Sequence, residues 1–403
     1  MKVGGLRDER WLLPPGVDEV LPPHARQLEM MRRRVLDIFH RWGYELVLPP
    51  LLEYLESLLN GPGAPLDLQT FKVIDQESGR LMGVRADMTP QVARIDAFHH
   101  EPSQGPSRLC YLGTVLHAQP DPFFGSRSPL QLGAELYGHS GVASDVEVMA
   151  LMVATLEAVG VPNIHLDLGH FGVYRALVAE LGLDASVADA VFAALQRKAP
   201  DEIAHALSGW PGETRAVEWM TRLAGLNGDR SVLDDVSQAF PDAPCELERS
   251  VDEIARLSDA FSARCPHIPL HFDLGELRGY SYHGGPVFAA FVPGVGTEVA
   301  RGGRYDQTDE PFGRPRPATG FSADLRLLMT LADPPPSSEG DKAIFAPVSE
   351  DPELGRTVDR LRAKGERVVE ELLGQAEGAD RATCDRRLER DGAAWKIVPL
   401  DSE

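Results

Sequence analysis

Four polar residues on or beside apolar strands could together recognise a free amino acid. They are Asp87, Thr89, Gln131 and Glu135. An amino acid needs an anion for its ammonium group, donors for its carboxylate and matched polar groups for its side chain. Gln131 and Glu135 share one strand face, because side chains along a strand alternate with a period of two. A single glutamate on a strand is more typical of a solvated face, and spacing alone favours that interpretation.

Two glycine-punctuated segments, 277–283 and 301–306, supply further candidates. Those candidates are Arg278, Tyr282, His283 and Tyr305. Glycine lets the backbone approach a ligand closely, although the pair Gly302-Gly303 is equally typical of a tight turn or bulge. A single histidine is also more often structural than functional. The sequence contains no GxxxxGKS/T, GxGxxG, HExxH or GxSxG pattern, so phosphate-loop, dinucleotide, zincin and hydrolase sites are not indicated.

The elements that must position these residues begin with a long amphipathic helix. Apolar residues recur at helical spacing from Leu28 to Trp42, and Gly43 follows where such a helix would end. Strands are predicted next at 44–48, 71–75, 81–85, 108–118 and 130–138. The second and third of these flank a turn at 77–80 and predict a hairpin. Because turns rather than crossover helices join the strands, the sheet is expected to be antiparallel.

The later part of the chain changes character three times. From about 171 to 265 the spacing becomes helical, which predicts a helical insertion. Strands at 270–274, 287–292 and 298–300 and a closing helix at 321–331 are then expected. The run 333–340 is rich in proline and serine and predicts a linker, before a small α/β domain at 341–403. The predicted fold class is therefore α+β: a core of residues 1–332 with an antiparallel sheet flanked by helices, and a small C-terminal domain.

The composition narrows the kind of protein further. The chain has 403 residues, 43% of them hydrophobic, a formal net charge of −21 and a pI near 5.0. This acidity argues against binding to the phosphates of nucleic acids. The four cysteines are scattered without metal-site or disulfide spacing. No apolar run has the length of a signal peptide or membrane span, so we expect a cytoplasmic location and no membrane association. We also expect no metal and no cofactor, because the sequence lacks the patterns that are typical of such sites.

In their order, the segments resemble the catalytic core of a class II aminoacyl-tRNA synthetase of the histidyl type. The resemblance covers roughly residues 8–331. Segment 43–53 resembles motif 1, which forms the dimer, and 85–89 resembles the loop whose acid and threonine hold the substrate ammonium group. Tyr111 to Glu135 resembles motif 2 with its histidine-contacting glutamine and glutamate. Segment 278–283 resembles the histidyl signature, 302–306 resembles the GGRYD sequence, and 320–325 resembles the start of motif 3.

Two arginines of the synthetases are absent from this sequence. The motif 2 arginine that grips the ATP α-phosphate is replaced by His117, and the acid of the same pattern by Gln119. Leu327 stands where motif 3 has its arginine, and Arg326 lies one residue early, about 100° round a helix. Each donor to developing phosphate charge is worth about a hundredfold in rate or more, so we expect no aminoacylation.

The pattern is closer to the ATP phosphoribosyltransferase regulatory subunits, a family of paralogues of the histidyl synthetase. Segments 280–285, 300–306 and 316–321 carry this resemblance. It implies a non-catalytic regulatory protein of the first step of histidine biosynthesis, which binds L-histidine and pairs with the short-form catalytic subunit of ATP phosphoribosyltransferase. It also implies a homodimer within a hetero-oligomer. The residues after Ala343 resemble a shortened anticodon-binding domain.

The resemblance implies a role for each candidate residue. Asp87, Thr89 and Gln131 would hold the ligand ammonium group, although Asp87 is one methylene shorter than the usual glutamate. Glu135 would accept a hydrogen bond from the imidazole, and His283 stands where the synthetase has tyrosine. Arg278 would face the ligand carboxylate and Tyr305 would line the pocket, and Tyr282 is also counted among the histidine-binding residues.

Three alternatives remain open from the sequence. The first is an active histidyl-tRNA synthetase, which the two absent arginines argue against. The second is another ATP-dependent amino-acid ligase on the same scaffold, which would have to bind ATP with magnesium. The third is a structural paralogue with a degenerate pocket. The joint presence of Asp87, Gln131, Glu135 and Arg278 argues against that third alternative.

Overall fold

The chain divides into two compact units, Met1–Pro335 and Pro336–Glu403, in a computed structural model. Each unit is described by itself. The structure describes the residues 12–59, 66–99, 105–120, 126–240, 243–275, 284–305, 316–333, 342–373, 384–392 and 394–400. The predicted linker, apart from Asp333, lies outside these ranges.

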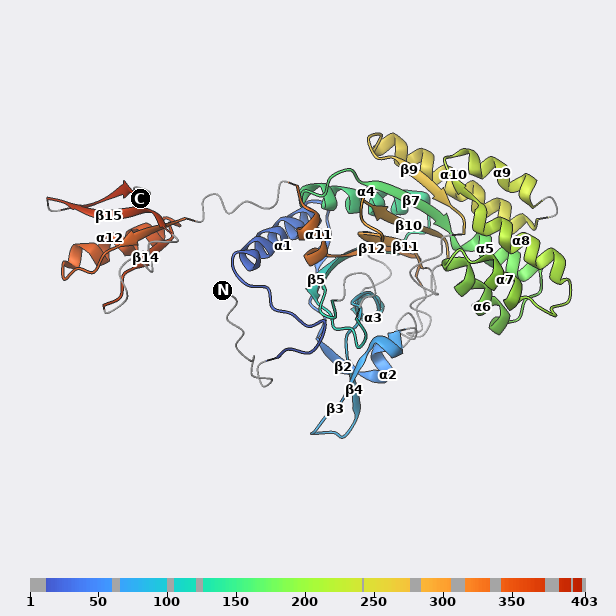
Figure 1. The fold of residues 1–403 in the computed structure, drawn as a ribbon, viewed down its shortest axis with the longest axis horizontal. Helices are drawn as coiled ribbons and strands as arrows, with labels where there is room; N and C mark the ends of the chain where they lie inside the picture. Colours follow the sequence, from blue (N-terminus) through green and yellow to red (C-terminus); the bar gives the residue numbers. More distant parts are fainter. Residues whose placement is uncertain are drawn as a thin grey trace, which may run out of the picture. The chain divides into compact units, whose positions relative to one another are not determined.

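A nine-stranded sheet organises the first unit, in the order β1-β5-β6-β12-β11-β10-β7-β9-β8 (Figure 1). Its strands are β1 (Glu45–Leu46), β5 (Ser107–Thr114), β6 (Leu130–Tyr137), β7 (His165–His170), β8 (Asn227–Gly228), β9 (Leu270–Asp273), β10 (Pro286–Phe291), β11 (Ala300–Arg304) and β12 (Ala318–Asp324). The six strands from β5 to β7 in this order pair antiparallel. The pairs β1–β5 and β7–β9 are parallel. The prediction of an α+β fold is thus confirmed, and the antiparallel arrangement holds for the centre of the sheet.

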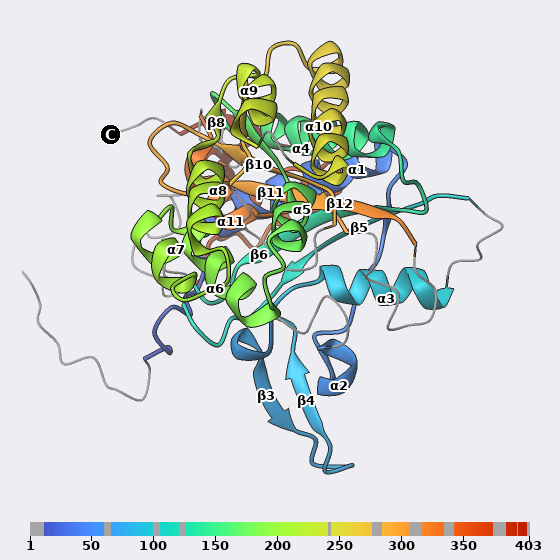
Figure 2. The same ribbon diagram turned by 90° about the vertical axis from the view of Figure 1, so that its right-hand side faces the viewer.

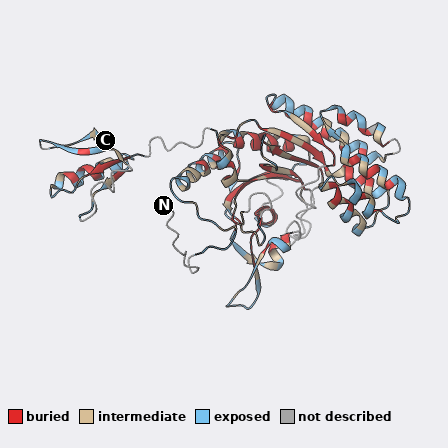
Figure 3. Ribbon diagram, in the orientation of Figure 1, coloured by how far each residue is buried: buried red, intermediate tan, exposed pale blue. Residues whose placement is uncertain are grey.

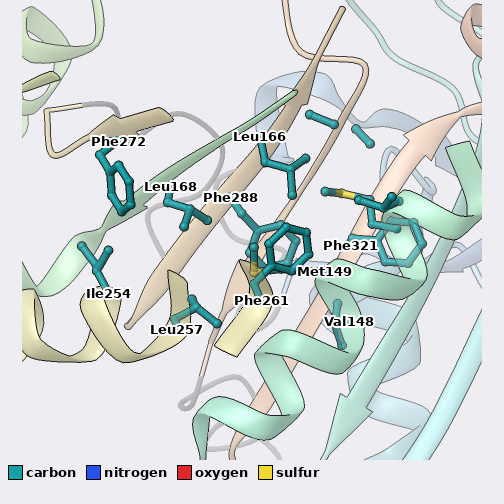
Figure 4. Packing of buried hydrophobic residues seen from close by; sticks show 14 of the residues in the cluster. Val148, Met149, Leu166, Leu168, Ile254, Leu257, Phe261, Phe272, Phe288 and Phe321 are labelled. Atoms are coloured by element: carbon teal, nitrogen blue, oxygen red, sulfur yellow. The ribbon is translucent and has the colours of Figure 1, made fainter. Parts of the chain in front are cut away.

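Helices cover the two faces of this sheet unequally. On one face lie α1 (His24–Arg41), α4 (Val142–Ala158) and α10 (Cys245–Arg264), whereas α3 (Thr89–His99) lies on the other (Figure 2). The main core fills the space between the sheet and α4 and α10, where Met149, Leu166, Phe261 and Phe288 meet (Figure 4). The face toward α3 carries the polar residues and is the one on which the candidate site lies.

A three-stranded sheet, in the order β2-β4-β3, stands beside the main sheet. Its elements are β2 (Leu52–Tyr54), the short helix α2 (Leu55–Leu58), β3 (Phe71–Ile74) and β4 (Leu81–Val84). The predicted hairpin is confirmed, since β3 and β4 pair antiparallel up to Ile74 and Leu81. The Asp75 carboxylate accepts hydrogen bonds from the backbone N–H groups of Glu77 and Ser78, which closes the turn. Figure 2 shows this hairpin projecting from the rest of the unit.

The segment predicted to be a helical insertion contains six helices. They are α5 (Phe171–Glu180), α6 (Ala185–Gln196), α7 (Pro200–Ala206), α8 (Glu213–Gly225), α9 (Ser231–Ala239) and α10. Only the inward faces of these helices are buried (Figure 3). Two of the helices start with recognisable signals: Asp184 accepts a hydrogen bond from the N–H of Val187 at the start of α6, and Pro200 lies in the first turn of α7.

The second unit is a small α/β sheet in the order β14-β13-β15-β16. Its elements are β13 (Ala343–Ala346), α12 (Pro352–Ala363), β14 (Val368–Glu370), β15 (Cys384–Asp391) and β16 (Ala394–Pro399). Ile344, Leu354, Val358 and Leu388 form its core. No helix among the described residues of either unit is long and apolar enough to cross a bilayer.

Two parts of the sequence prediction are wrong or incomplete. The closing helix predicted at 321–331 begins only at Leu325, as α11 (Leu325–Leu331), because residues up to Asp324 pair as β12 with β6 and β11. The helix α4 was not predicted, and neither were β2, α2, α3 and β7. Eleven residues of α4 are buried, so it has no polar stripe from which a helical period could be recognised.

Candidate functional site

The structure brings five of the eight predicted site residues together. Asp87 lies between β4 and α3, Thr89 starts α3, Gln131 and Glu135 lie on β6, and Tyr305 follows β11. All five are at most 9% exposed. The other three, Arg278, Tyr282 and His283, lie outside the described residues.

The Asp87 end of the site is held by a small set of hydrogen bonds. The Gln131 amide donates from Nε2 to Asp87 Oδ1 at 2.8 Å and accepts at Oε1 from the N–H of Met88 at 2.9 Å. The N–H of Thr89 also donates to Asp87 Oδ1, at 2.9 Å. This network fixes a carboxylate at the start of α3, where the positive end of the helix dipole favours an anion.

The Glu135 end is a carboxylate surrounded by hydroxyl groups. The Tyr305 hydroxyl donates to Glu135 Oε2, and the hydroxyls of Thr89 and Tyr111 lie 3.2 and 3.1 Å from Oε1. Burial of this side chain raises the pKa of Glu135 to about 8, and the nearby Asp87 charge adds to the shift while the three hydroxyls oppose it. A further hydrogen-bond donor, such as a ligand N–H, would stabilise the ionised form of Glu135 and lower its pKa.

Tyr305 is positioned by the residue before it. Arg304 forms an ion pair with Asp145 of α4, with Nη2 2.8 Å from Oδ2, and both side chains are at most 3% exposed. Since neighbouring side chains on a strand point to opposite faces, this anchor directs Tyr305 toward Glu135. The N–H of Tyr305 also donates to the carbonyl of Ala318 at 2.8 Å.

The sequence analysis did not count Tyr111 among the site residues. This tyrosine of β5 is fully buried, and its hydroxyl is 2.9 Å from Thr89 Oγ1. The available signal was Gly133, which pairs with Tyr111 across β5 and β6. A Cβ atom on Gly133 would lie 2.3 Å from the Tyr111 hydroxyl, so only glycine leaves room for the ring.

Near this site lie His117 and Leu327, at the positions where the resemblance places the two synthetase arginines. The His117 ring places Nε2 3.0 Å from the carbonyl oxygen of Ala86. Arg326 donates to the Ser128 carbonyl at 3.1 Å and forms an ion pair with Asp18. Its guanidinium group is therefore engaged away from the pocket.

Leu327 and Asp324 complete this second region. Leu327 packs against the main core. Asp324 pairs with Gln131 across β12 and β6, and it accepts hydrogen bonds from the N–H groups of Leu130 and Arg326 at 3.0 Å each. Burial raises its pKa, whereas Arg326 and His117 oppose that shift. A carboxylate thus occupies a position where the synthetase pattern has glycine.

The described residues give no indication of a metal site. No group of three or more histidine, cysteine, aspartate or glutamate side chains in the described ranges is arranged to hold a metal ion. The site consists of two carboxylates, amide groups and hydroxyls, which is a set of groups suited to an organic ligand that carries hydrogen-bond donors.

The sheet order, motif geometry and buried carboxylates define a protein of the class II aminoacyl-tRNA synthetase type. Residues 16–328 match the family model for histidyl-tRNA synthetase, and 341–398 match that for the C-terminal domain of the ATP phosphoribosyltransferase subunit HisZ. The regulatory subunit of ATP phosphoribosyltransferase from Alkalilimnicola ehrlichii is 52% identical over 98% of both chains. That from Ectopseudomonas mendocina is 54% identical over 98% of this chain and 99% of its own. The chain belongs to the family of ATP phosphoribosyltransferase regulatory subunits.

Solved structures agree with this assignment. A crystal structure from Bacillus halodurans, described as an ATP phosphoribosyltransferase regulatory subunit/histidyl-tRNA synthetase, superposes with a TM-score of 0.80 at 26% identity. The match covers 92% of this chain and 95% of the Bacillus halodurans chain. Histidyl-tRNA synthetase from Nostoc shares the fold at a TM-score of 0.74 and 18% identity, covering 94% and 91%. The predicted regulatory role is therefore confirmed, and the synthetase alternative is not favoured.

Proposed function

We propose that the pocket binds free L-histidine and that its occupancy controls an ATP phosphoribosyltransferase catalytic subunit. The observation that carries the proposal is the pair of buried carboxylates, Asp87 and Glu135, 3% and 1% exposed, at two ends of one hydrogen-bonded site. A buried carboxylate is costly unless donors surround it. L-Histidine offers a donor for each, since its ammonium group and its ring N–H lie at opposite ends of the molecule.

Each described residue has a role in this proposal. Asp87, Thr89 and Gln131 are assigned to the ammonium group, because the Asp87 carboxylate, held by the Gln131 amide and the Thr89 N–H, places an acceptor with negative charge at the start of α3. Glu135 accepts the hydrogen bond from the ring N–H. Tyr305 holds the Glu135 carboxylate in place through its hydroxyl.

Three residues outside the described ranges enter on the family resemblance alone. Arg278 is assigned to the ligand carboxylate, and Tyr282 and His283 are counted among the histidine-binding residues. A guanidinium group suits this task because it can bind a carboxylate through two parallel hydrogen bonds.

The same proposal excludes activation of the bound amino acid. Activation requires positive charge around the ATP phosphates. At the corresponding positions the chain has His117 and Leu327, while the Asp324 carboxylate would repel a phosphate. A pocket that binds histidine without ATP suits a sensor and not a ligase.

The partner is the short-form catalytic subunit of ATP phosphoribosyltransferase, in a cytoplasmic hetero-oligomer that contains a homodimer of this chain. The dimer is supported by exposed leucines at the β1 edge of the sheet, Leu46 at 46% and Leu48 at 74%. Feedback requires that histidine bind two assembly states with different affinity, a coupling of about 1–3 kcal/mol. Nucleic acid is not among the partners, because the acidic chain would repel it.

Reconstitution with the catalytic subunit tests this proposal. Transferase activity is measured for the catalytic subunit alone, with this chain, and with this chain plus L-histidine. We expect activation by the chain, inhibition by histidine, and loss of the inhibition in Glu135→Gln. Histidine inhibition that is unchanged in Glu135→Gln would contradict the assigned pocket, and an absence of activation would contradict the partner.

A further inference from the structure

Tyr111 connects the two ends of the pocket. Its side chain is fully buried, with the hydroxyl 2.9 Å from Thr89 Oγ1 and 3.1 Å from Glu135 Oε1. Thr89 belongs to the end assigned to the ligand ammonium group, and Glu135 to the end assigned to the ring. The Thr89 hydroxyl also donates directly to Glu135 Oε1 at 3.2 Å, so the Tyr111 hydroxyl completes a triangle of hydrogen bonds that holds these two residues relative to each other.

Two glycines make this arrangement possible. Gly133 lies opposite Tyr111 across β5 and β6, and Gly320 lies opposite Glu135 across β6 and β12. A Cβ atom at Gly320 would lie 1.6 Å from Glu135 Oε2, and one at Gly133 would lie 2.3 Å from the Tyr111 hydroxyl. Because Gly133 and Gly320 lack side chains, the Tyr111 ring can lie over β6 and the Glu135 carboxylate over β12. The Tyr111 hydroxyl and Glu135 Oε1 are then 3.1 Å apart.

Packing alone does not explain a tyrosine at this position. The ring belongs to a small apolar cluster with Met88, Val92 and Tyr137, where phenylalanine would fill the same space. A buried hydroxyl costs free energy unless it is hydrogen-bonded, so phenylalanine would be the simpler choice for a core position. The hydroxyl is placed between two groups of the proposed ligand site.

We propose that Tyr111 is a positioning residue for histidine recognition, holding Thr89 and Glu135 at the spacing that suits the two ends of the ligand. This inference rests on the proposed function of the pocket. Tyr111 acts through these two residues, and its removal leaves both in place but free to adopt other rotamers.

A shift in pH dependence distinguishes positioning from general loss of structure. The groups that face Glu135 are Asp87, Thr89, Tyr111 and Tyr305, from the α3, β5 and β11 sides. Burial raises the pKa of Glu135 to about 8, and the Tyr111 hydroxyl acts in the opposite direction. Without that hydroxyl the pKa rises further, so the ionised carboxylate that accepts the ligand N–H appears at higher pH.

The test is calorimetric titration of the full-length chain with L-histidine between about pH 6.5 and 9, around the expected ionisation. The variant is Tyr111→Phe. Its matched control is Tyr44→Phe, which removes another buried phenol whose hydroxyl donates to Glu147 at 3.1 Å, on the opposite face of the sheet. Melting temperatures of all three proteins report whether folding is retained.

We expect Tyr111→Phe to weaken histidine binding by about tenfold, as for loss of one hydrogen bond to a charged acceptor, and to move the midpoint of the pH profile upward. Tyr44→Phe should bind as the wild type does. Gly133→Ala, which keeps the hydroxyl but displaces the ring, should weaken binding in the same direction and serves if Tyr111→Phe does not fold.

Two results would overturn the inference, and they differ from failure of the proposed function. Wild-type affinity in Tyr111→Phe would show that the hydroxyl does not position the site. Weaker binding with an unmoved pH midpoint would show a structural role only. If the wild-type chain itself does not bind histidine, the proposed function fails, and this inference fails with it.

Discussion

Two neighbouring regions of the first unit differ in what their side chains can bind. The first, which we call the amino-acid region, consists of Asp87, Thr89, Gln131, Glu135 and Tyr305. The second, the phosphate region, consists of His117, Asp324, Arg326 and Leu327. In the amino-acid region, buried polar groups are connected to one another around two carboxylates. In the phosphate region, Arg326 is bound to Asp18 and Ser128, and Leu327 packs into the core.

The difference supports the proposal that recognition and activation of an amino acid depend on separate parts of one scaffold. Negative charge persists where the ligand is expected to carry hydrogen-bond donors and a positive charge. At the positions where the resemblance places the two arginines of the synthetases the chain has His117 and Leu327, and Asp324 is an acidic group of the same region. The family of regulatory subunits to which the chain belongs is consistent with this division.

Among variants of the amino-acid region, Glu135→Gln should have the largest effect on histidine affinity. This variant replaces the carboxylate proposed to accept from the ligand ring by a neutral amide, and we expect histidine binding to weaken by about 2–3 kcal/mol, the cost of losing a charge-assisted hydrogen bond. Calorimetry measures the change. Glu147→Gln is the matched control, since that carboxylate accepts from the Tyr44 hydroxyl on the opposite face. An equal loss in both variants would mean that the effect is not local to the pocket.

Asp87→Ala should have a somewhat smaller effect. We expect a loss of about 1–3 kcal/mol in histidine binding, because the ammonium group keeps Thr89 and Gln131 as neutral partners. Asp229→Ala, which removes an exposed carboxylate that caps Ser231, is the control and should bind normally. Unchanged affinity in Asp87→Ala would mean that the residue roles are wrongly assigned.

Affinity should also depend on pH in a defined direction. The pKa of Glu135 is raised to about 8, so the carboxyl group is largely protonated at pH 7 and ionises as the pH rises. Histidine affinity should therefore increase toward pH 8, by at most about tenfold per pH unit. Affinity that falls steadily over this range would contradict the role of Glu135.

The ionisation of Glu135 should also change the free energy of unfolding with pH. Because the pKa of Glu135 is raised on folding, its contribution to stability is present at low pH and is lost as the pH rises through about 8. Glu135→Gln should then unfold at higher temperature than the wild type at pH 9, by a free energy of at least about 1 kcal/mol. A lower melting temperature at that pH would show that the carboxylate stabilises the ligand-free protein.

The smallest effect should come from the phosphate region. Restoring both arginines, in the double variant His117→Arg and Leu327→Arg, should bring only weak binding of ATP with magnesium, since Asp324 remains. Adding Asp324→Gly should strengthen it, by about tenfold for removal of one unfavourable charge. Strong ATP binding by the wild type would remove the distinction between the two regions.

Much of the scaffold can be predicted from the sequence because its pattern is local. The helix α1 was recognised from a one-sided apolar stripe, and Met31, Val35 and Phe39 of that stripe are buried. The hairpin β3–β4 was recognised from its turn residues and short apolar runs. In each case one face of the element meets solvent, which makes the period visible.

The remaining features depend on pairing between distant segments. Residues 321–324 of β12 were predicted to be part of a helix, since an apolar run looks alike in a buried strand and a buried helix. Tyr111 was missed for a related reason. Its role depends on its register with Gly133 and on the position of α3, and neither is encoded in the local sequence.

The central claim is that this chain binds an amino acid and not ATP. The most direct test is calorimetric titration of the purified chain with L-histidine, followed by ATP with magnesium in the same buffer. We predict saturable heat with histidine and none with ATP. Saturable binding of ATP, or an absence of histidine binding both alone and with the catalytic subunit present, would contradict the account.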